Sequence, residues 1–276
     1  MTTVPLTLLG LGRMGVPMAH RLAAEGWSVT AWNRTPRDLP DAEGRLTVET
    51  DLAAALQDAE IVLLALFDAA ACEEVLALAR PHLRPGALVV NTATVGPQEA
   101  AALAAAGGAD YVHAPVVGSV PQVEAGSLVV LAAGPRVEEA RVPLAALGEV
   151  RVQPDATTAA GLKLVANASI GTALLALRDT LTQARALDLP DAEVLDVLSV
   201  GLLGTLVTRK RPFLEGADLP AQFTLGALAK DLRLLDDATP VAFTAAARIA
   251  AHLTDPAVGP DADIAAAVTA PDPTGS

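Results

Sequence analysis

The chain of 276 residues is poor in cysteine, in aromatic residues and in basic residues. Cys72 is the only cysteine, which excludes an intrachain disulfide and a metal site built on cysteine. The Lys and Arg residues number 19 against 32 Asp and Glu, and the formal net charge of −13 argues against nucleic acid as a partner. The histidines lack the spacing of metal ligands, so we predict no metal: His20, His82, His113 and His252.

Long apolar runs and a basic leader are also missing from the sequence. The runs Ile61–Phe67 and Leu128–Ala133 have the length of buried strands, well short of the roughly 20 residues of a membrane span. The start Met1-Thr2-Thr3-Val4-Pro5 has no basic segment before an apolar one. We therefore expect no signal peptide, no membrane partner and a cytoplasmic location.

The most informative feature that is present is a cluster of glycines near the N-terminus. A strand expected at Val4–Leu9 leads into it, a helix expected at Met14–Ala24 follows, and Ser28–Trp32 is expected to form the next strand. In this context the glycines permit a tight turn, a close approach of the backbone to a pyrophosphate and close packing of helix on strand. The cluster predicts a dinucleotide site made by Gly10, Leu11, Gly12, Arg13, Met14 and Gly15.

The residues after the second expected strand indicate which dinucleotide binds. An NAD site has Asp or Glu there for the ribose hydroxyls, whereas this chain has Asn33-Arg34-Thr35. No carboxylate is there to repel a 2′-phosphate, and the guanidinium of Arg34, the amide of Asn33 and the hydroxyl of Thr35 are donors that bind one, so NADP(H) is favoured over NAD(H). The alternative is that Arg34 is only a solvated residue of the turn before Pro36.

Short strands and Ala-rich helices alternate over residues 1–155. Further strands are expected at Ile61–Leu66, Leu88–Asn91, Asp110–His113, Leu128–Ala132 and Val150–Val152, and further helices at Leu52–Leu56, Ala71–Leu78, Pro97–Ala106 and Val137–Leu147. This alternation indicates an α/β fold whose N-terminal domain is a Rossmann-type doubly wound parallel sheet.

Residues 156–276 have helical spacing throughout and predict an all-helical C-terminal domain for substrate binding and oligomerisation. A long helix from about Ala156 to Leu187 comes first, and further helices are expected at Ala192–Val200, Leu203–Phe213, Leu225–Ala238, Val241–Leu253 and Asp261–Val268. Helices this apolar are buried in a core or against a second subunit, so we expect a homodimer or homotetramer.

Lys163 and Asn167 lie four residues apart near the start of the long helix, so their side chains project from one face. A partly desolvated lysine is suited to exchange a proton with an alkoxide or carbonyl oxygen. The alternative is a lysine on a solvated face that extends its charge into water.

Four segments, in this order along the chain, carry a family resemblance. They are Gly10–Gly15 with Pro17-Met18-Ala19, Asn91–Pro97, Gly161–Asn167 and Phe223–Leu232. Together they resemble the β-hydroxyacid dehydrogenases, the family of 3-hydroxyisobutyrate dehydrogenase, tartronate semialdehyde reductase and the glyoxylate or succinic semialdehyde reductases.

The resemblance implies a role for several side chains. Lys163 would be the general acid/base and Asn167 would bind substrate, while the residues that would contact the cofactor are Leu66, Phe67, Asp68, Thr94 and Lys230. Two alternatives stay open: Lys230 and Asp231 form only a surface charge pair, and Thr94 belongs to the start of a helix at Gly96-Pro97.

The expected substrate loop departs from the family pattern. Val117 stands where a serine normally binds the substrate carboxylate, which leaves Gly118 and Ser119 to hold that group, and Ala166 replaces an asparagine. The resemblance implies NADP(H)-linked hydride transfer to or from a small carboxylate substrate, either a 3-hydroxy acid or a semialdehyde. An imine reductase-like enzyme and a non-catalytic NADP(H)-binding module are the alternatives, and Lys163 argues against the first.

Overall fold

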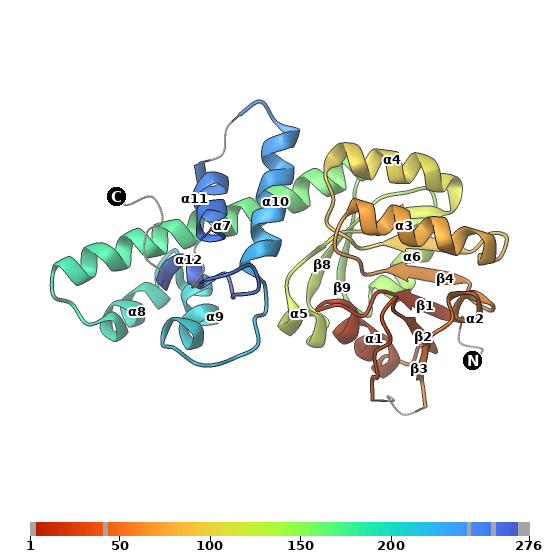
Figure 1. Cartoon of the computed structure of the whole chain (residues 1–276), viewed down its shortest axis with the longest axis horizontal. Helices are drawn as coiled ribbons and strands as arrows, with labels where there is room; N and C mark the ends of the chain where they lie inside the picture. The colour runs from red at the N-terminus through yellow and green to blue at the C-terminus, as the bar shows by residue number, and fades with distance from the viewer. Residues whose placement is uncertain (1–3, 41–43, 242–243, 255–257, 270–276) are drawn as a thin grey trace. The chain divides into compact units, whose positions relative to one another are not determined.

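The computed structural model describes residues 4–40, 44–241, 244–254 and 258–269 (Figure 1). The chain divides into two compact units, Met1–Lys163 and Leu164–Ser276. The division lies inside helix α7 (Ala156–Ala186), whereas the sequence places the boundary at the start of that helix. The two units are therefore best described one at a time.

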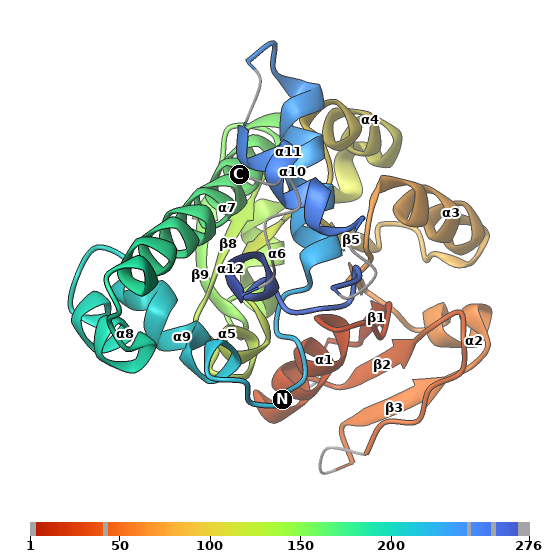
Figure 2. The ribbon, with the colours of Figure 1, turned by 60° about the vertical axis from the view of Figure 1, so that its left-hand side comes forward.

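A six-stranded parallel sheet forms the centre of the first unit (Figure 2). Its strands are β1 (Leu6–Leu9), β2 (Val29–Trp32), β3 (Leu46–Glu49), β4 (Ile61–Leu64), β5 (Leu88–Asn91) and β6 (Tyr111–His113), in the order β3-β2-β1-β4-β5-β6. The register pairs Leu9 with both Trp32 and Leu64, so the carboxyl ends of these strands meet at one edge. The strand order reverses between β1 and β4, which is where doubly wound sheets bind ligands.

Helices cover both faces of this sheet. On one face Leu8 packs with Met18 of α1 (Gly15–Ala24), together with α5 (Val120–Glu124) and α6 (Val137–Leu144). On the other face Leu9 packs with Cys72 of α3 (Ala69–Ala79), together with α2 (Leu52–Leu56), α4 (Pro97–Gly107) and the start of α7. Short 3-10 turns at Arg80–His82 and Gly108–Asp110 lead toward β5 and β6.

The last strands of the first unit correct the sequence prediction. β8 (Leu128–Ala132) and β9 (Gly148–Val152) are not part of the doubly wound sheet, but form a second sheet with β7 (Val116–Val117). β7 runs antiparallel to β8, and a bridge between His113 and Ala133 joins the two sheets. The sequence also missed β3, β7 and α5, which are short elements with little apolar periodicity.

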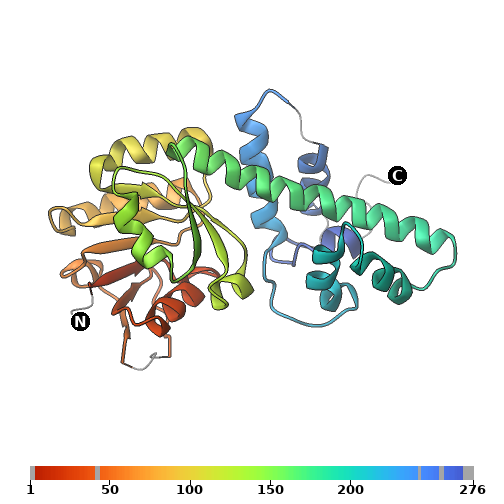
Figure 3. The same cartoon turned by 180° about the vertical axis from the view of Figure 1, so that it is seen from behind.

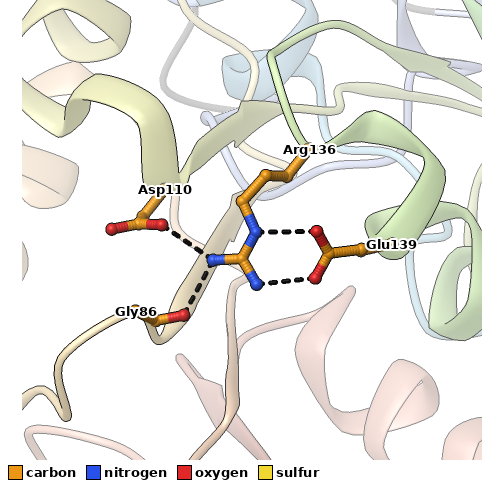
Figure 4. A network of polar contacts seen from close by, with 4 residues as sticks. All are labelled: Gly86, Asp110, Arg136 and Glu139. Atoms are coloured by element: carbon orange, nitrogen blue, oxygen red, sulfur yellow. Dashed lines mark hydrogen bonds and ion pairs between the residues drawn. The ribbon is translucent and has the colours of Figure 1, made fainter.

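Arg136 binds three other residues near the amino edge of the large sheet (Figure 4). Its guanidinium donates to the carbonyl of Gly86, which precedes β5, at 2.7 Å and to Asp110, which precedes β6, at 2.8 Å. Two further bonds, of 2.9 and 2.6 Å, join it to Glu139 of α6. The hydrogen bonds to Glu139 raise the pKa of Arg136 above its ordinary value.

The described part of the second unit is helical (Figure 3). Its helices are the rest of α7, α8 (Asp191–Ser199), α9 (Gly204–Leu214), α10 (Leu225–Ala238), α11 (Thr244–His252) and α12 (Ala266–Thr269). The helix expected at Asp261–Val268 is wrong over its first half, because Asp263 instead bridges to Thr224 and binds the buried Lys210. The helix expected from Val241 begins at Thr244, and residues 242–243 lie outside the described residues.

Helix α7 has the length and mean hydropathy of a membrane span, which the sequence analysis did not anticipate. Half of its most apolar window is buried within the protein. Leu174, Leu177 and Leu181 are at most 2% exposed and pack in the core of the second unit. Burial of this kind is typical of a core helix, whose apolar side chains face protein rather than lipid.

Candidate functional site

The glycine turn follows β1 at the carboxyl edge of the sheet. Gly10 has a φ of 108°, and a Cβ there would lie 2.6 Å from the carbonyl oxygen of Ala65. A Cβ at Gly15 would lie 1.9 Å from the carbonyl oxygen of Gly10, so no larger residue fits without moving the turn. Gly12 differs, because apart from its two chain neighbours no described residue has an atom within 4 Å of a Cβ built on it. The turn is thus closed on the protein side and open at Gly12, which fits a bound pyrophosphate.

The segment after β2 holds the backbone of this turn. The N–H of Leu11 donates to Oδ1 of Asn33 at 2.9 Å, and the guanidinium of Arg37 donates to the carbonyl of Leu11 at 2.6 Å. The amide nitrogen of Asn33 donates in turn to the carbonyl of Thr35 at 2.8 Å. The sequence reasoning placed Asn33 and Thr35 at the cofactor but missed Arg37.

Arg34, the expected ligand of a 2′-phosphate, pairs with Glu74 of α3 at 2.8 Å. The two side chains are 70% and 52% exposed. An ion pair this exposed contributes between about 0 and 1 kcal/mol, so a phosphate dianion can displace Glu74 from the guanidinium.

A pocket of about 760 Å³ begins at the glycine turn. Gly12 and Arg13 line one end of it, and it extends along α1 to Ala24 with Arg37 at its wall. Arg34 is not among its lining residues. Three guanidinium groups, those of Arg13, Arg21 and Arg37, thus line this pocket together with the carboxylate of Glu124.

The residues after β4 and β5 reach the same edge of the sheet. Phe67 is 57% exposed, and Asp68, next to Leu66 and Phe67, caps α3 by accepting the N–H of Ala71 at 2.9 Å. After β5, Gly96 caps α4, and its N–H donates to Glu99 at 2.7 Å. The helix start expected at Gly96-Pro97 is confirmed; Thr94 precedes this cap.

The expected substrate loop is held by its own residues. Gly118 has a φ of 137°, and a Cβ there would lie 2.5 Å from the side chain of Leu128. Both the N–H and the hydroxyl of Ser119 donate to Oε1 of Gln122, at 2.8 and 2.9 Å, as the start of α5 requires. Val117 is partly buried and packs against Leu131 and its neighbours. A carboxylate bound by the Ser119 hydroxyl would have to replace its bond to Gln122.

His113 lies at the end of β6, shortly before this loop, and is fully buried. Neither of its ring nitrogens has a hydrogen-bond partner among the residues that the structure describes. Burial lowers the pKa of His113 to about 4, because a charged imidazolium is poorly solvated there. Within that described part of the chain, no three His, Cys, Asp or Glu side chains gather into a possible metal site.

The candidate site residues of α7 and α10 are buried. Lys163, the last residue of the first unit, is 5% exposed, so the alternative of a solvated lysine is wrong. In the second unit Asn167 is 3% exposed and its amide nitrogen donates to Asp231 at 2.5 Å. The Nζ of Lys230 lies 2.9 Å from the other carboxylate oxygen of Asp231. Lys230 and Asp231 are at most 9% exposed, so they do not form the surface pair considered above.

Comparison with known proteins supplies further evidence. Residues 5–153 match the NAD binding domain of 6-phosphogluconate dehydrogenase. An uncharacterized oxidoreductase of Synechocystis sp. is 28% identical, over 86% of this chain and 87% of that protein. Glyoxylate/succinic semialdehyde reductase 2 of Arabidopsis thaliana is 28% identical, over 88% of this chain and 73% of its own length.

Solved structures share the fold over nearly the whole chain. The 3-hydroxyisobutyrate dehydrogenase of Mycobacterium tuberculosis with L-serine has a TM-score of 0.81 at 21% identity, covering 97% of this chain and 99% of the other. Psf3 in complex with NADP+ and 2-OPP has a TM-score of 0.80 at 24% identity, covering 96% and 99%.

Proposed function

The chain belongs to the β-hydroxyacid dehydrogenase family, and on that premise we propose that it is an NADP(H)-preferring dehydrogenase. It moves hydride between the cofactor and a small 3-hydroxy acid or semialdehyde. The observation that carries the proposal is the glycine turn, which is sterically closed at Gly10 and Gly15 and open at Gly12. This turn lies at the switch point of a doubly wound sheet, where dinucleotides bind.

The preference for NADP(H) rests on charge. No carboxylate follows β2 to accept the ribose 2′-hydroxyl, and Arg34 lies beside that position. A guanidinium binds a phosphate through paired, charge-assisted hydrogen bonds. NADP+ bound to Psf3, a protein of the same fold, supports the same preference.

The protein's part in the reaction is to position the substrate and move one proton, while the nicotinamide, when bound, supplies or accepts the hydride. Lys163 donates its proton to the carbonyl oxygen during reduction and takes it back from the hydroxyl during oxidation. Its burial limits the access of water to that proton. Asn167 binds the substrate, and the backbone around Gly118 with Ser119 holds the carboxylate.

Val117 sets the choice of substrate. A serine hydroxyl at this place would add a hydrogen bond to a charged carboxylate, and such a bond contributes about 1.5–3 kcal/mol. We expect a substrate whose carbon chain contacts Val117. We also expect the protein to assemble as a homodimer or homotetramer.

The test measures consumption of NADPH and of NADH by the purified protein. The substrates are glyoxylate, succinic semialdehyde, methylmalonate semialdehyde and tartronate semialdehyde. Turnover that is faster with NADPH supports the proposal. The substrate with the highest rate shows which carbon chain is accepted next to Val117. Binding of NADPH without turnover of any compound contradicts it and favours a binding module.

A further inference from the structure

We propose that Asn33 and Arg37 are positioning residues that hold the backbone of the glycine turn, and that the selection of the 2′-phosphate is the task of Arg34. The inference deepens the proposed function, because it concerns the same cofactor site. It revises the expectation that Asn33 donates to the phosphate. It also assigns a task to Arg37, which no motif had marked.

The side-chain amide of Asn33 forms hydrogen bonds at both of its ends. Its oxygen accepts the N–H of Leu11 and its nitrogen donates to the carbonyl of Thr35. Each end of the amide is thus bonded to the backbone, and Thr35 takes one of the two N–H groups of the amide nitrogen. The two bonds fix the orientation of the amide, so Asn33 positions the backbone of the turn.

Leu11 is held at both its backbone N–H and its backbone carbonyl. Asn33 binds its N–H, and the guanidinium of Arg37 binds its carbonyl at 2.6 Å. Leu11 separates Gly10, which is pressed against Ala65, from Gly12, which is open. Because the backbone at Leu11 is held in place, the position of the Gly12 backbone relative to a bound pyrophosphate is fixed as well.

These bonds also explain why an amide, and not a carboxylate, follows β2. A carboxylate in place of Asn33 would still accept from Leu11, but its second oxygen would face the carbonyl oxygen of Thr35 at about the same 2.8 Å. Two acceptors at hydrogen-bond distance repel each other. The aspartate typical of an NAD site would thus open the loop from Asn33 to Arg37.

The two roles are separated by comparing two dinucleotides. A residue that positions the turn affects NADPH and NADH alike, because both carry the pyrophosphate, whereas a phosphate ligand affects NADPH alone. We expect Asn33→Ala and Arg37→Ala to weaken both dinucleotides by about 3- to 10-fold with their ratio unchanged, as loss of one hydrogen bond requires. Arg34→Ala is expected to lower the affinity for NADPH alone. Arg45→Ala, which removes an exposed guanidinium bound to the carbonyl of Gly26, is the matched control and leaves both affinities unchanged.

Amide hydrogen exchange at Leu11 supplies a readout that does not depend on cofactor or turnover. We expect faster exchange in Asn33→Ala and unchanged exchange in Arg34→Ala and Arg45→Ala. If Asn33→Ala or Arg37→Ala weakens NADPH alone and leaves exchange at Leu11 unchanged, the positioning role is refuted. A wild-type protein that binds neither dinucleotide contradicts the proposed function, and the exchange rates still decide the inference. If Asn33→Ala does not fold, the exposed Arg37→Ala is tested for faster exchange across the turn.

Discussion

Alanine at Gly12 and at Gly15 should have opposite effects on folding and on cofactor binding. Gly12 has no positive φ, and apart from its chain neighbours no described residue has an atom within 4 Å of a Cβ built there. Gly12→Ala should therefore change the free energy of unfolding by no more than about 0.5 kcal/mol. The added methyl group enters the space that the pyrophosphate needs. An overlap of this kind costs about 1–3 kcal/mol, or about 5- to 150-fold in affinity for NADPH.

Gly15→Ala should instead destabilise the fold. A Cβ at 1.9 Å from the carbonyl oxygen of Gly10 forces the turn and α1 apart. We expect a loss of about 3 kcal/mol and a fall in Tm of about 6–12 °C.

The assay pairs a thermal melt without cofactor with titration of NADPH. Gly201→Ala is the control, since its only near neighbour is the carbonyl oxygen of Leu198 at 3.6 Å, and it should change neither result. Wild-type affinity in Gly12→Ala would refute the close approach of the pyrophosphate. A wild-type Tm in Gly15→Ala would refute the packing derived for the turn.

Two further predictions concern buried charge. Asp263→Asn should lower the free energy of unfolding by about 3–5 kcal/mol, because the charge of Lys210, only 7% exposed, then lacks its partner. Denaturant unfolding at neutral pH measures this loss, and wild-type stability would contradict the prediction. His113 is the second case: since its pKa falls from 6.5 to about 4 on folding, the unfolded chain binds more protons between about pH 4 and 6.5, and stability rises with pH across that window. His113→Leu should remove up to about 3 kcal/mol of this dependence, and an unchanged pH profile of unfolding would exclude His113 as its source.

Sequence reasoning performed best where one local pattern determines the structure. The glycine turn, the parallel strands beside it and the long helix α7 each follow from steric need or from apolar periodicity. It did not predict the conformation of segments whose structure depends on contacts with residues distant in sequence. β3 is a half-exposed edge strand. Its pairing with β2 stabilises the extended conformation, which its own residues do not predict. The segment at Asp263 has helical composition, but its bonds to Lys210 and to the N–H of Gln222 hold it in another conformation.

The candidate site shows the same limit. Sequence spacing suggested that Lys163 and Asn167 share a helix face, and both lie in α7. Spacing carried no sign that Asp231, 64 residues further on, binds the amide of Asn167. Nor did it indicate that Arg37 contacts Leu11 or that Glu74 pairs with Arg34, since each contact joins segments that only the fold brings together.

Proton transfer by Lys163 in NADPH-linked turnover is tested by comparing three forms of the protein. The rate of NADPH oxidation with the best semialdehyde is measured for wild type, for Lys163→Ala and for Val165→Ala, a control that is 57% exposed on the same helix. We predict that Lys163→Ala loses at least about 100-fold in kcat, as removal of a general acid does, with NADPH affinity and Tm close to wild type, and that Val165→Ala loses nothing. A Lys163→Ala protein that folds, binds NADPH and turns over at the wild-type rate would contradict the account.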